Sequence, residues 1–122
     1  MPRSITPTPE SHLPLRPLEL LVLAMLAEGD RHGYAIRQAI LEHTSDAIEV
    51  EAGNLYRHIR RLDRAGLIEE SGRRPAADLD DERRRYFRMT PLGKRVLAAE
   101  MLRLRVLVRY AEDHAVITPV RS

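Results

Sequence analysis

Apolar residues recur at the spacing of an α-helix in four parts of the chain. They predict helices over residues 17–27, 33–43, 53–64 and 91–114. The first of these is apolar almost all round, so we expect it to be buried on two sides. The last begins at Thr90-Pro91, which supplies a hydroxyl cap and a first-turn proline.

Two further stretches, residues 67–72 and 85–89, mix apolar and charged residues in the manner of short strands. They flank a polar connection and predict a β-hairpin. The helices at 33–43 and 53–64 match a helix-turn-helix layout, and a hairpin that follows such a unit is called a wing. The predicted fold class is therefore mainly α with a small β-hairpin: a winged helix-turn-helix with a C-terminal helix.

The last predicted helix carries a seam of apolar residues. Its members recur at alternating spacings of four and three, as in a coiled coil: Leu97, Met101, Leu104, Val108 and Ala111. Leu102, Val106 and Leu107 widen the apolar surface beyond what one small core can cover. We interpret this seam as the interface of a homodimer, and packing within one chain is the alternative.

The positive charge is concentrated in the middle of the chain. Residues 1–52 carry four arginines against eight acids, a net charge of −4, whereas residues 53–95 carry twelve basic residues against seven acids, a net charge of +5. Residues 96–122 add +1, which gives the total of +2. A polyanionic partner is therefore expected to meet the middle third.

The predicted helix at residues 53–64 separates an apolar face from an arginine face. Leu55, Ile59 and Leu62 share one side, and the arginines lie mostly on the other. A helix N-terminus and planar guanidinium groups suit phosphate oxygens and guanine edges, so we interpret this face as a contact for double-stranded DNA. A solvated charged face is the alternative. The candidate DNA contacts are Asn54, Tyr56, Arg57, Arg60 and Arg61 from this helix, and Arg84 and Arg85 from the hairpin, with Lys94 behind them.

Different roles are expected within this set. We expect Arg57 and Arg61 to reach base edges, whereas Arg60 meets the DNA backbone or solvent. Two alternatives stay open: Tyr56 packs in the core, and the hairpin arginines pair with neighbouring acids. His58, which lies among the arginines, is expected to be a solvated imidazole.

The domain boundaries follow from these elements. Residues 1–14 contain four prolines and few apolar residues, so we expect a flexible N-terminal arm with no role in folding. Residues 15–90 form the winged helix-turn-helix DNA-binding domain in this scheme. Residues 91–114 form the C-terminal dimerisation helix, and residues 115–122 form a flexible tail.

Other kinds of chemistry find little support in the sequence. The chain has no cysteine, and its five histidines lack the spacing of metal ligands. We find no catalytic constellation, so we expect neither a metal, nor a cofactor, nor enzymatic activity. The apolar run at residues 18–27 is too short to span a bilayer, and no secretory signal is recognised. The sequence therefore predicts a cytoplasmic protein without membrane contact.

Four short motifs, in order, make the chain resemble the PadR-type transcriptional regulators. They are Leu26-Ala27-Glu28-Gly29 leading to His32-Gly33-Tyr34, then Gly53-Asn54-Leu55-Tyr56, then Leu62 followed by Gly66-Leu67-Ile68, then Arg85-Tyr86-Phe87 leading to Thr90 and Gly93. The resemblance implies a winged helix-turn-helix homodimer, of the subtype with a short C-terminal region, that binds operator DNA and usually represses. Tyr34 resembles a tyrosine of that family's second helix, with a role in phosphate contact or in structure.

The resemblance also suggests that the protein responds to a small-molecule effector, whose identity is unknown. The chain departs from the family where Phe87 replaces a second tyrosine, and where four acids occupy the hairpin connection (Asp78, Asp80, Asp81 and Glu82). Acids at a wing tip repel phosphate. An alternative function is therefore a winged-helix module that binds protein and has lost DNA recognition.

Overall fold

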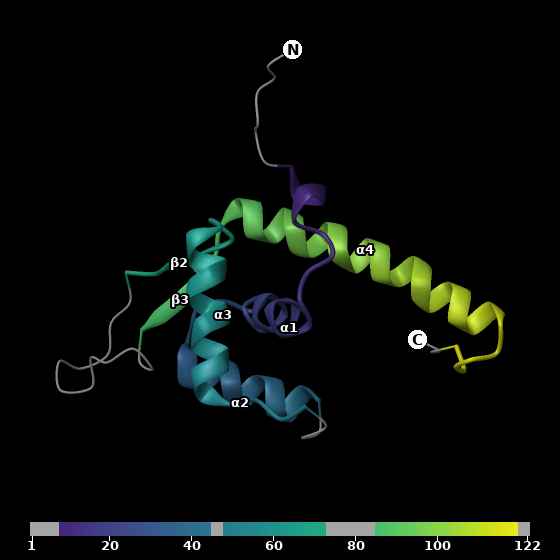
Figure 1. The fold of residues 1–122 in the computed structure, drawn as a ribbon, viewed down its shortest axis with the longest axis horizontal. Helices are drawn as coiled ribbons and strands as arrows, with labels where there is room; N and C mark the ends of the chain where they lie inside the picture. Colours follow the sequence, from purple (N-terminus) through teal and green to yellow (C-terminus); the bar gives the residue numbers. More distant parts are fainter. Residues whose placement is uncertain (1–7, 45–47, 73–84, 120–122) are drawn as a thin grey trace, which may run out of the picture.

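The computed structural model describes residues 8–44, 48–72 and 85–119 of the 122-residue chain. Its elements are η1 (Pro9–His12), α1 (Pro17–Met25), β1 (Arg31–His32), α2 (Gly33–His43), α3 (Ala52–Arg64), β2 (Ile68–Glu70), β3 (Tyr86–Met89) and α4 (Pro91–Asp113) (Figure 1). All four predicted helices are present, and their ends agree with the prediction within two residues. The element order confirms the predicted winged helix-turn-helix with a C-terminal helix.

Local sequence signals explain where the helices begin and end. Thr90 caps α4 by accepting a hydrogen bond from the backbone N–H of Gly93 at 3.0 Å, as predicted. His32 caps α2 in the same way, since its Nδ1 accepts from the backbone N–H of Ala35 at 3.0 Å. After α3 the chain reverses at Gly66, whose φ of +78° is a conformation that glycine adopts readily.

The sheet contains one strand more than predicted. Its order is β1-β3-β2, and both pairings are antiparallel. The predicted hairpin corresponds to β2 and β3, in which Ile68 lies opposite Met89. The unpredicted strand β1 places Arg31 opposite Phe87 and His32 opposite Tyr86. A strand of two residues is too short to show an alternating pattern, which is why the sequence did not reveal it.

The core lies where the helices meet the sheet. It includes Leu23 of α1, Ile40 of α2, Ile68 of β2 and Val96 of α4, each almost completely buried. The predicted inner face of α3, formed by Leu55, Ile59 and Leu62, is confirmed because all three are buried. Tyr34 of α2 lies outside this core, because its side chain is 50% exposed.

A glycine allows α4 to pack closely on the segment between α3 and β2. A Cβ atom on Gly93 would lie 1.9 Å from the backbone oxygen of Leu67, a distance that no side chain can adopt. The backbone of Leu67 also accepts a hydrogen bond from the Thr90 N–H at 3.1 Å. The first turns of α4 are therefore part of the same core as the winged helix-turn-helix, although they lie beyond the predicted domain boundary at residue 90.

The predicted N-terminal arm is partly wrong. Within the described residues, η1 packs against α4, and Leu15 is buried in the core. The backbone N–H of Leu15 donates to Oε2 of Glu100 at 2.9 Å, and the carboxylate of Glu100 is itself buried. Residues 8–14 are thus folded onto α4, because a buried acid on that helix binds the chain that crosses it. Residues 1–7 of the predicted arm lie outside the described residues.

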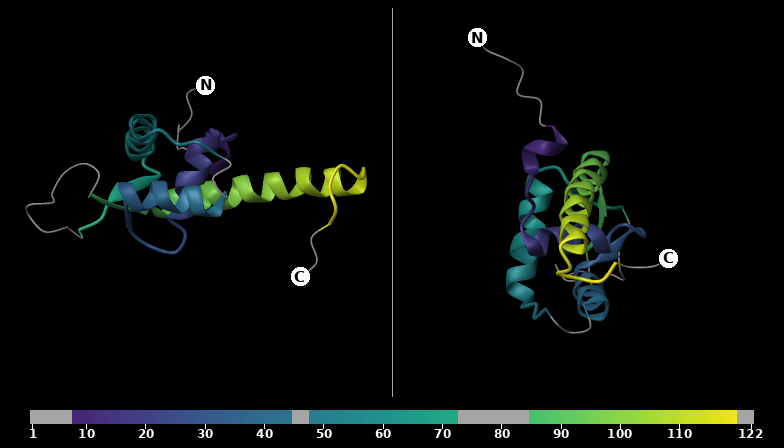
Figure 2. Two further views of the ribbon diagram at one scale, coloured as in Figure 1. Left: turned by 90° about the horizontal axis from the view of Figure 1, so that it is seen from below. Right: turned by 90° about the vertical axis from the view of Figure 1, so that its right-hand side faces the viewer.

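The second half of α4 projects beyond the other helices (Figures 1 and 2). Three residues of the predicted seam, Leu97, Leu104 and Ala111, are partly buried, whereas Met101 and Val108 are exposed. Val106, the most exposed large apolar residue of this helix, is 68% exposed. Among the described helices, none combines the length and the apolar character that a membrane span requires.

The chain turns back immediately after α4. Residues 115–119 are exposed, and the backbone N–H of Val116 donates to the carbonyl of Ala111 at 2.8 Å. Residues 120–122 of the predicted tail lie outside the described part of the chain.

Candidate nucleic-acid interface

Helix α3 presents its charged face to solvent because its apolar face is buried. Arg57, Arg60 and Arg64 are exposed on it, as the sequence predicted for an arginine face. Near the start of the helix, Oδ1 of Asn54 accepts a short hydrogen bond from Nη2 of Arg57. This contact keeps the guanidinium of Arg57 beside the helix N-terminus. Two of the candidate contacts are therefore joined at one end of α3.

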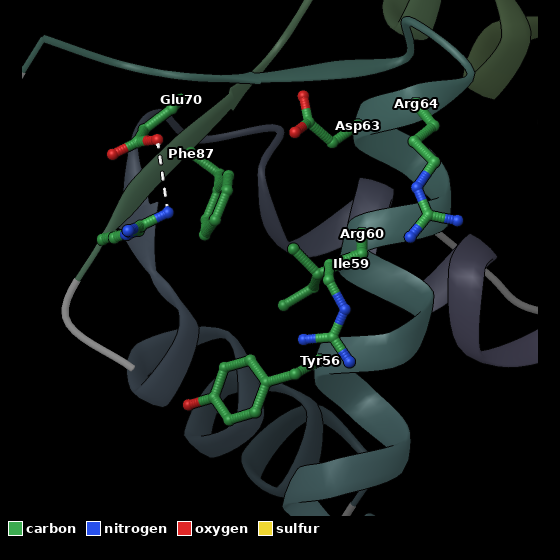
Figure 3. A pocket seen from close by; sticks show the side chains of 8 residues that line it. Tyr56, Ile59, Arg60, Asp63, Arg64, Glu70 and Phe87 are labelled. Carbon is green, nitrogen blue, oxygen red and sulfur yellow. Dashed lines mark ion pairs between the residues drawn. The ribbon is translucent and has the colours of Figure 1, made fainter. Parts of the chain in front are cut away.

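A cleft of about 220 Å³ lies between α3 and the wing strands. We call it the α3–wing cleft; it is lined by Tyr56, Ile59, Arg60, Asp63, Arg64, Glu70, Arg85 and Phe87. Figure 3 shows Arg60 and Arg64 on the helix side and the Phe87 ring on the strand side. Ile59 points into the space between them.

The α3–wing cleft has an excess of positive charge. Three guanidinium groups face two carboxylates, those of Asp63 and Glu70. Nη1 of Arg85 lies 3.9 Å from Oε2 of Glu70, and the Arg85 side chain is 52% exposed. Such an exposed pair contributes at most about 1 kcal/mol and is readily exchanged for another anion. The predicted pairing of hairpin arginines with acids is therefore present at Arg85, but it is weak.

Arg61, predicted to reach base edges, has a partner within the protein that the sequence did not reveal. Nε of Arg61 donates to Oε2 of Glu19 on α1 at 2.9 Å, and the Glu19 side chain is 7% exposed. Nδ1 of His58 lies 2.7 Å from the same oxygen. Nε of Arg61 thus binds a buried carboxylate and helps to hold α3 on α1, and a contact of Arg61 with base edges stays a prediction.

The same cluster corrects the prediction for His58. Its side chain is 14% exposed and is not a solvated imidazole. Sequence reasoning missed the Glu19–His58–Arg61 cluster, because its members are about forty positions apart. The signal that could have found it is Glu19 itself, an acid in a helix that is otherwise apolar almost all round.

The two candidate tyrosines lie in different environments. Tyr56 is partly buried and packs against the core and against Gly33, where a Cβ atom would lie 2.5 Å from Cε1 of the ring. The core-packing alternative therefore holds for the ring of Tyr56, which also lines the α3–wing cleft. Tyr34 is exposed and not part of the core, and its hydroxyl accepts a hydrogen bond from Nε2 of Gln38 at 2.9 Å.

Two candidate contacts remain, Lys94 and Arg84, and the structure describes only the first of them. Lys94 is exposed in the first turn of α4. Arg84 lies outside the described residues, as do the four acids of the hairpin connection. In the described part of the chain, no group of three or more histidine, aspartate or glutamate side chains is arranged to hold a metal ion.

Comparison with known proteins gives a family match over most of the chain. The model of the "Transcriptional regulator PadR-like family" matches residues 22–99. An uncharacterised protein from Lysinibacillus sphaericus is 33% identical over 82 residues, which cover 66% of this chain and 72% of that protein.

Solved structures share the fold. A transcriptional regulator from Clostridium thermocellum matches with a TM-score of 0.66 and 24% identity, over 79% of this chain and 87% of that one. PadR of Bacillus subtilis, solved in complex with operator DNA, matches with a TM-score of 0.61 and 21% identity, over 73% of this chain and 48% of that one. At these identities the likeness establishes the architecture.

Proposed function

The chain belongs to the PadR-like family of transcriptional regulators, and we propose that it is a sequence-specific DNA-binding repressor that acts as a homodimer on a palindromic operator. The observation that carries this proposal is the orientation of α3. Its buried apolar face fixes the helix, and its exposed arginines face outward beside the wing. The Bacillus subtilis relative with the same fold has been solved with operator DNA, which supports duplex DNA as the partner.

The front of α3 is the part that we assign to sequence recognition. The major groove, about 12 Å wide, admits an α-helix, and arginine pairs bidentately with a guanine edge. Arg57 and Asn54 lie at the exposed N-terminal end of the helix and are joined by a hydrogen bond. This bond restricts the motion of the Arg57 guanidinium, so less side-chain entropy is lost when the group meets a base.

The α3–wing cleft is the part that we assign to the DNA backbone. Arg60, Arg64 and Arg85 present guanidinium groups along its edges, and these groups suit phosphate oxygens. A phosphate in the cleft replaces Glu70 as the partner of Arg85. Lys94 adds a further cation near the wing. These contacts position the protein on DNA and are insensitive to sequence.

The apolar face of α4 supports the homodimer. The helix continues well beyond the core, and the side chains of Met101 and Val108 in its seam remain exposed. A second copy of α4 covers this surface in the proposed dimer, with Leu97, Leu104 and Ala111 at its inner edge. Twofold symmetry then requires a palindromic operator with half-sites about one helical turn or more apart.

A DNA-binding measurement tests the proposal. The intact protein is titrated with fluorescent duplexes from the intergenic DNA upstream of its own gene, at several salt concentrations. Neutralising about six phosphates per half-site gives a log–log salt slope near −5 per subunit. Arg57→Ala should cost about 1–3 kcal/mol and relax the sequence preference, whereas Arg60→Ala should weaken binding to all sequences alike.

Arg109→Ala is the matched control, since it removes the same charge from the far end of α4. Its affinity for DNA should equal that of the unmodified protein. Absence of binding at low salt would favour the protein-binding alternative. Equal, sequence-independent losses for Arg57→Ala and Arg60→Ala would remove the assignment of Arg57 to base recognition, and a footprint without a dyad would contradict the palindromic operator.

A further inference from the structure

Glu19 is a buried charge to which the proposed function has so far given no part. It lies on α1, a helix that is otherwise apolar almost all round, and its side chain is 7% exposed. Burying a carboxylate is costly unless the group is well paired. Because a buried ion pair adds little net stability compared with apolar packing, the position of its partners indicates a further role. Both partners lie on α3, the helix that we assign to DNA.

The carboxylate of Glu19 holds one edge of the Arg61 guanidinium. Nε of Arg61 donates to Oε2 of Glu19 at 2.9 Å, and Nδ1 of His58 lies 2.7 Å from the same oxygen. His58 and Arg61 are three residues apart on α3, so together they fix the carboxylate from one side of the helix. The ion pair uses Nε of Arg61, and the side chain is 47% exposed, so the fork formed by the two Nη atoms is left for another acceptor.

Arg61 belongs to a row of polar side chains along α3. Asn54, Arg57 and Arg61 are spaced by three and four residues, so they lie along one side of the helix, and both arginines are exposed. Arg57 is held by Oδ1 of Asn54, and Arg61 is held by Glu19. Each guanidinium of the row therefore has a hydrogen bond within the protein that limits its motion. The other arginines of α3 line the α3–wing cleft instead.

We propose that Glu19 is a positioning residue for base recognition, because it holds the Arg61 guanidinium so that its two Nη atoms meet a guanine edge in the major groove. This inference rests on the proposed function. Arginine pairs bidentately with O6 and N7 of guanine, which requires a fixed orientation of the planar group, and the bond at Nε restricts that orientation. The four residues from Arg57 to Arg61 span about 6 Å of helix, so the two arginines suit base pairs about two steps apart.

The charge of Glu19 favours base contacts of Arg61 over phosphate contacts. The two side chains together are neutral, so the pair adds little to the attraction of the protein for DNA of any sequence. The Nη donors of Arg61 still form hydrogen bonds with a base, and these depend on sequence. Glu19 therefore increases the discrimination between sequences more than it increases affinity.

Fluorescence titration of the intact protein measures this discrimination. The probes are the upstream duplex that carries the operator, duplexes with one guanine–cytosine pair changed at a time, and a duplex of unrelated sequence. A change at the pair that Arg61 contacts should lower the affinity of the unmodified protein about tenfold. Arg61→Ala should remove this discrimination, and Glu19→Gln should reduce it between about twofold and tenfold, since the freed side chain must be ordered on binding.

The unrelated duplex separates positioning from a general loss of structure. Glu19→Gln removes one negative charge beside Arg61, so its affinity for this duplex should be unchanged or higher, with a log–log salt slope steeper by about 1. Circular dichroism at the assay temperature verifies that each variant is folded. Glu19→Asp keeps the charge but withdraws the carboxylate by one methylene. It should lower discrimination at the same base pair without a change in salt slope, and it serves as the test where Glu19→Gln does not fold.

Two further variants make the result specific to the Glu19–Arg61 pair. Glu19→Gln combined with Arg61→Ala should discriminate no less than Arg61→Ala alone, because the two residues act through one contact. Glu69→Gln is the matched control. Oε2 of Glu69 pairs with Nε of Arg88 at the same 2.9 Å, but this acid is 46% exposed on the wing, so its loss should leave discrimination at every base pair unchanged.

Three results would overturn the positioning role alone. They are equal losses of Glu19→Gln on the operator and the unrelated duplex, unchanged discrimination in the folded Glu19 variants, and unchanged discrimination of Arg61→Ala at every base pair. In each case sequence-specific binding by the unmodified protein keeps the proposed function intact. If the unmodified protein binds no duplex, or binds all duplexes equally, the proposed function fails and the role of Glu19 fails with it.

Discussion

Replacing Glu100 by glutamine should destabilise the protein measurably. Its carboxylate is 1% exposed and accepts hydrogen bonds from the backbone N–H of Leu15 at 2.9 Å and from Nε of Arg103 at 2.5 Å. Glutamine keeps one oxygen acceptor but loses the charge, so a buried donor is left poorly paired. We expect a loss of about 2 kcal/mol, or roughly 8 °C in unfolding temperature for a domain of this size.

The effect of Glu100→Gln should depend on pH. The hydrogen bond from Arg103 lowers the pKa of Glu100 below its ordinary value of 4.5, which outweighs the opposing effect of burial, and the Leu15 N–H lowers the pKa further. The unfolded chain therefore binds this proton more tightly than the folded protein does. The stabilisation is complete above the unfolded pKa of about 4.5 and is lost as the pH falls through the folded pKa.

Urea unfolding from about pH 7 down to about pH 3.5 measures this difference, at one protein concentration because dimerisation affects apparent stability. The gap between the unmodified protein and Glu100→Gln should be widest near neutrality and should close in acid. Asp113→Asn, a change at a 62% exposed acid at the end of the same helix, is the control and should have little effect. A gap that is the same at every pH, or an equal loss for Asp113→Asn, would refute the reasoning.

Three further changes test other parts of the structure. Gly93→Ala should lower the free energy of unfolding in urea, despite the better helix propensity of alanine, because its Cβ meets the Leu67 carbonyl; an unchanged midpoint would contradict this close packing. Glu19→Gln should cost about 1–3 kcal/mol in the same assay, since the partly buried His58 and the exposed Arg61 both lose a charged, buried acceptor, and a neutral result would show that they re-pair with water. Val108→Glu, at an exposed position of the seam, should convert the proposed dimer into a monomer in light scattering with helix content unchanged, and a persistent dimer would place the interface elsewhere.

The elements of the fold were predictable because their signals are local. Apolar spacing located all four helices, and Thr90-Pro91 marked the start of α4. Contacts between distant positions were not predictable. The Leu15 N–H and the Glu100 carboxylate are 85 positions apart, so the prolines near the N-terminus were interpreted as a flexible arm.

In the candidate site, too, the local features were predictable from the sequence and the contacts between distant residues were not. Composition and helical spacing identified the arginines of α3, because the burial of Leu55, Ile59 and Leu62 determines the outward face. They could not show the direction of each guanidinium. Arg61 lies at the edge of that face, where a buried acid 42 positions earlier binds it. The α3–wing cleft likewise depends on the pairing of strands, which the sequence predicts only in outline.

The short strand β1 links the two parts of the molecule that face the proposed DNA. His32 pairs with Tyr86 in the sheet and contacts its ring edge-on, and the same residue caps α2. The helix-turn-helix and the base of the wing are therefore joined at His32 as well as through the shared core. Their spacing is set before any encounter with a duplex, so the entropy of arranging them is lost during folding and not during association. In the proposed complex, the helix-turn-helix and the wing therefore reach the DNA already held in their binding arrangement.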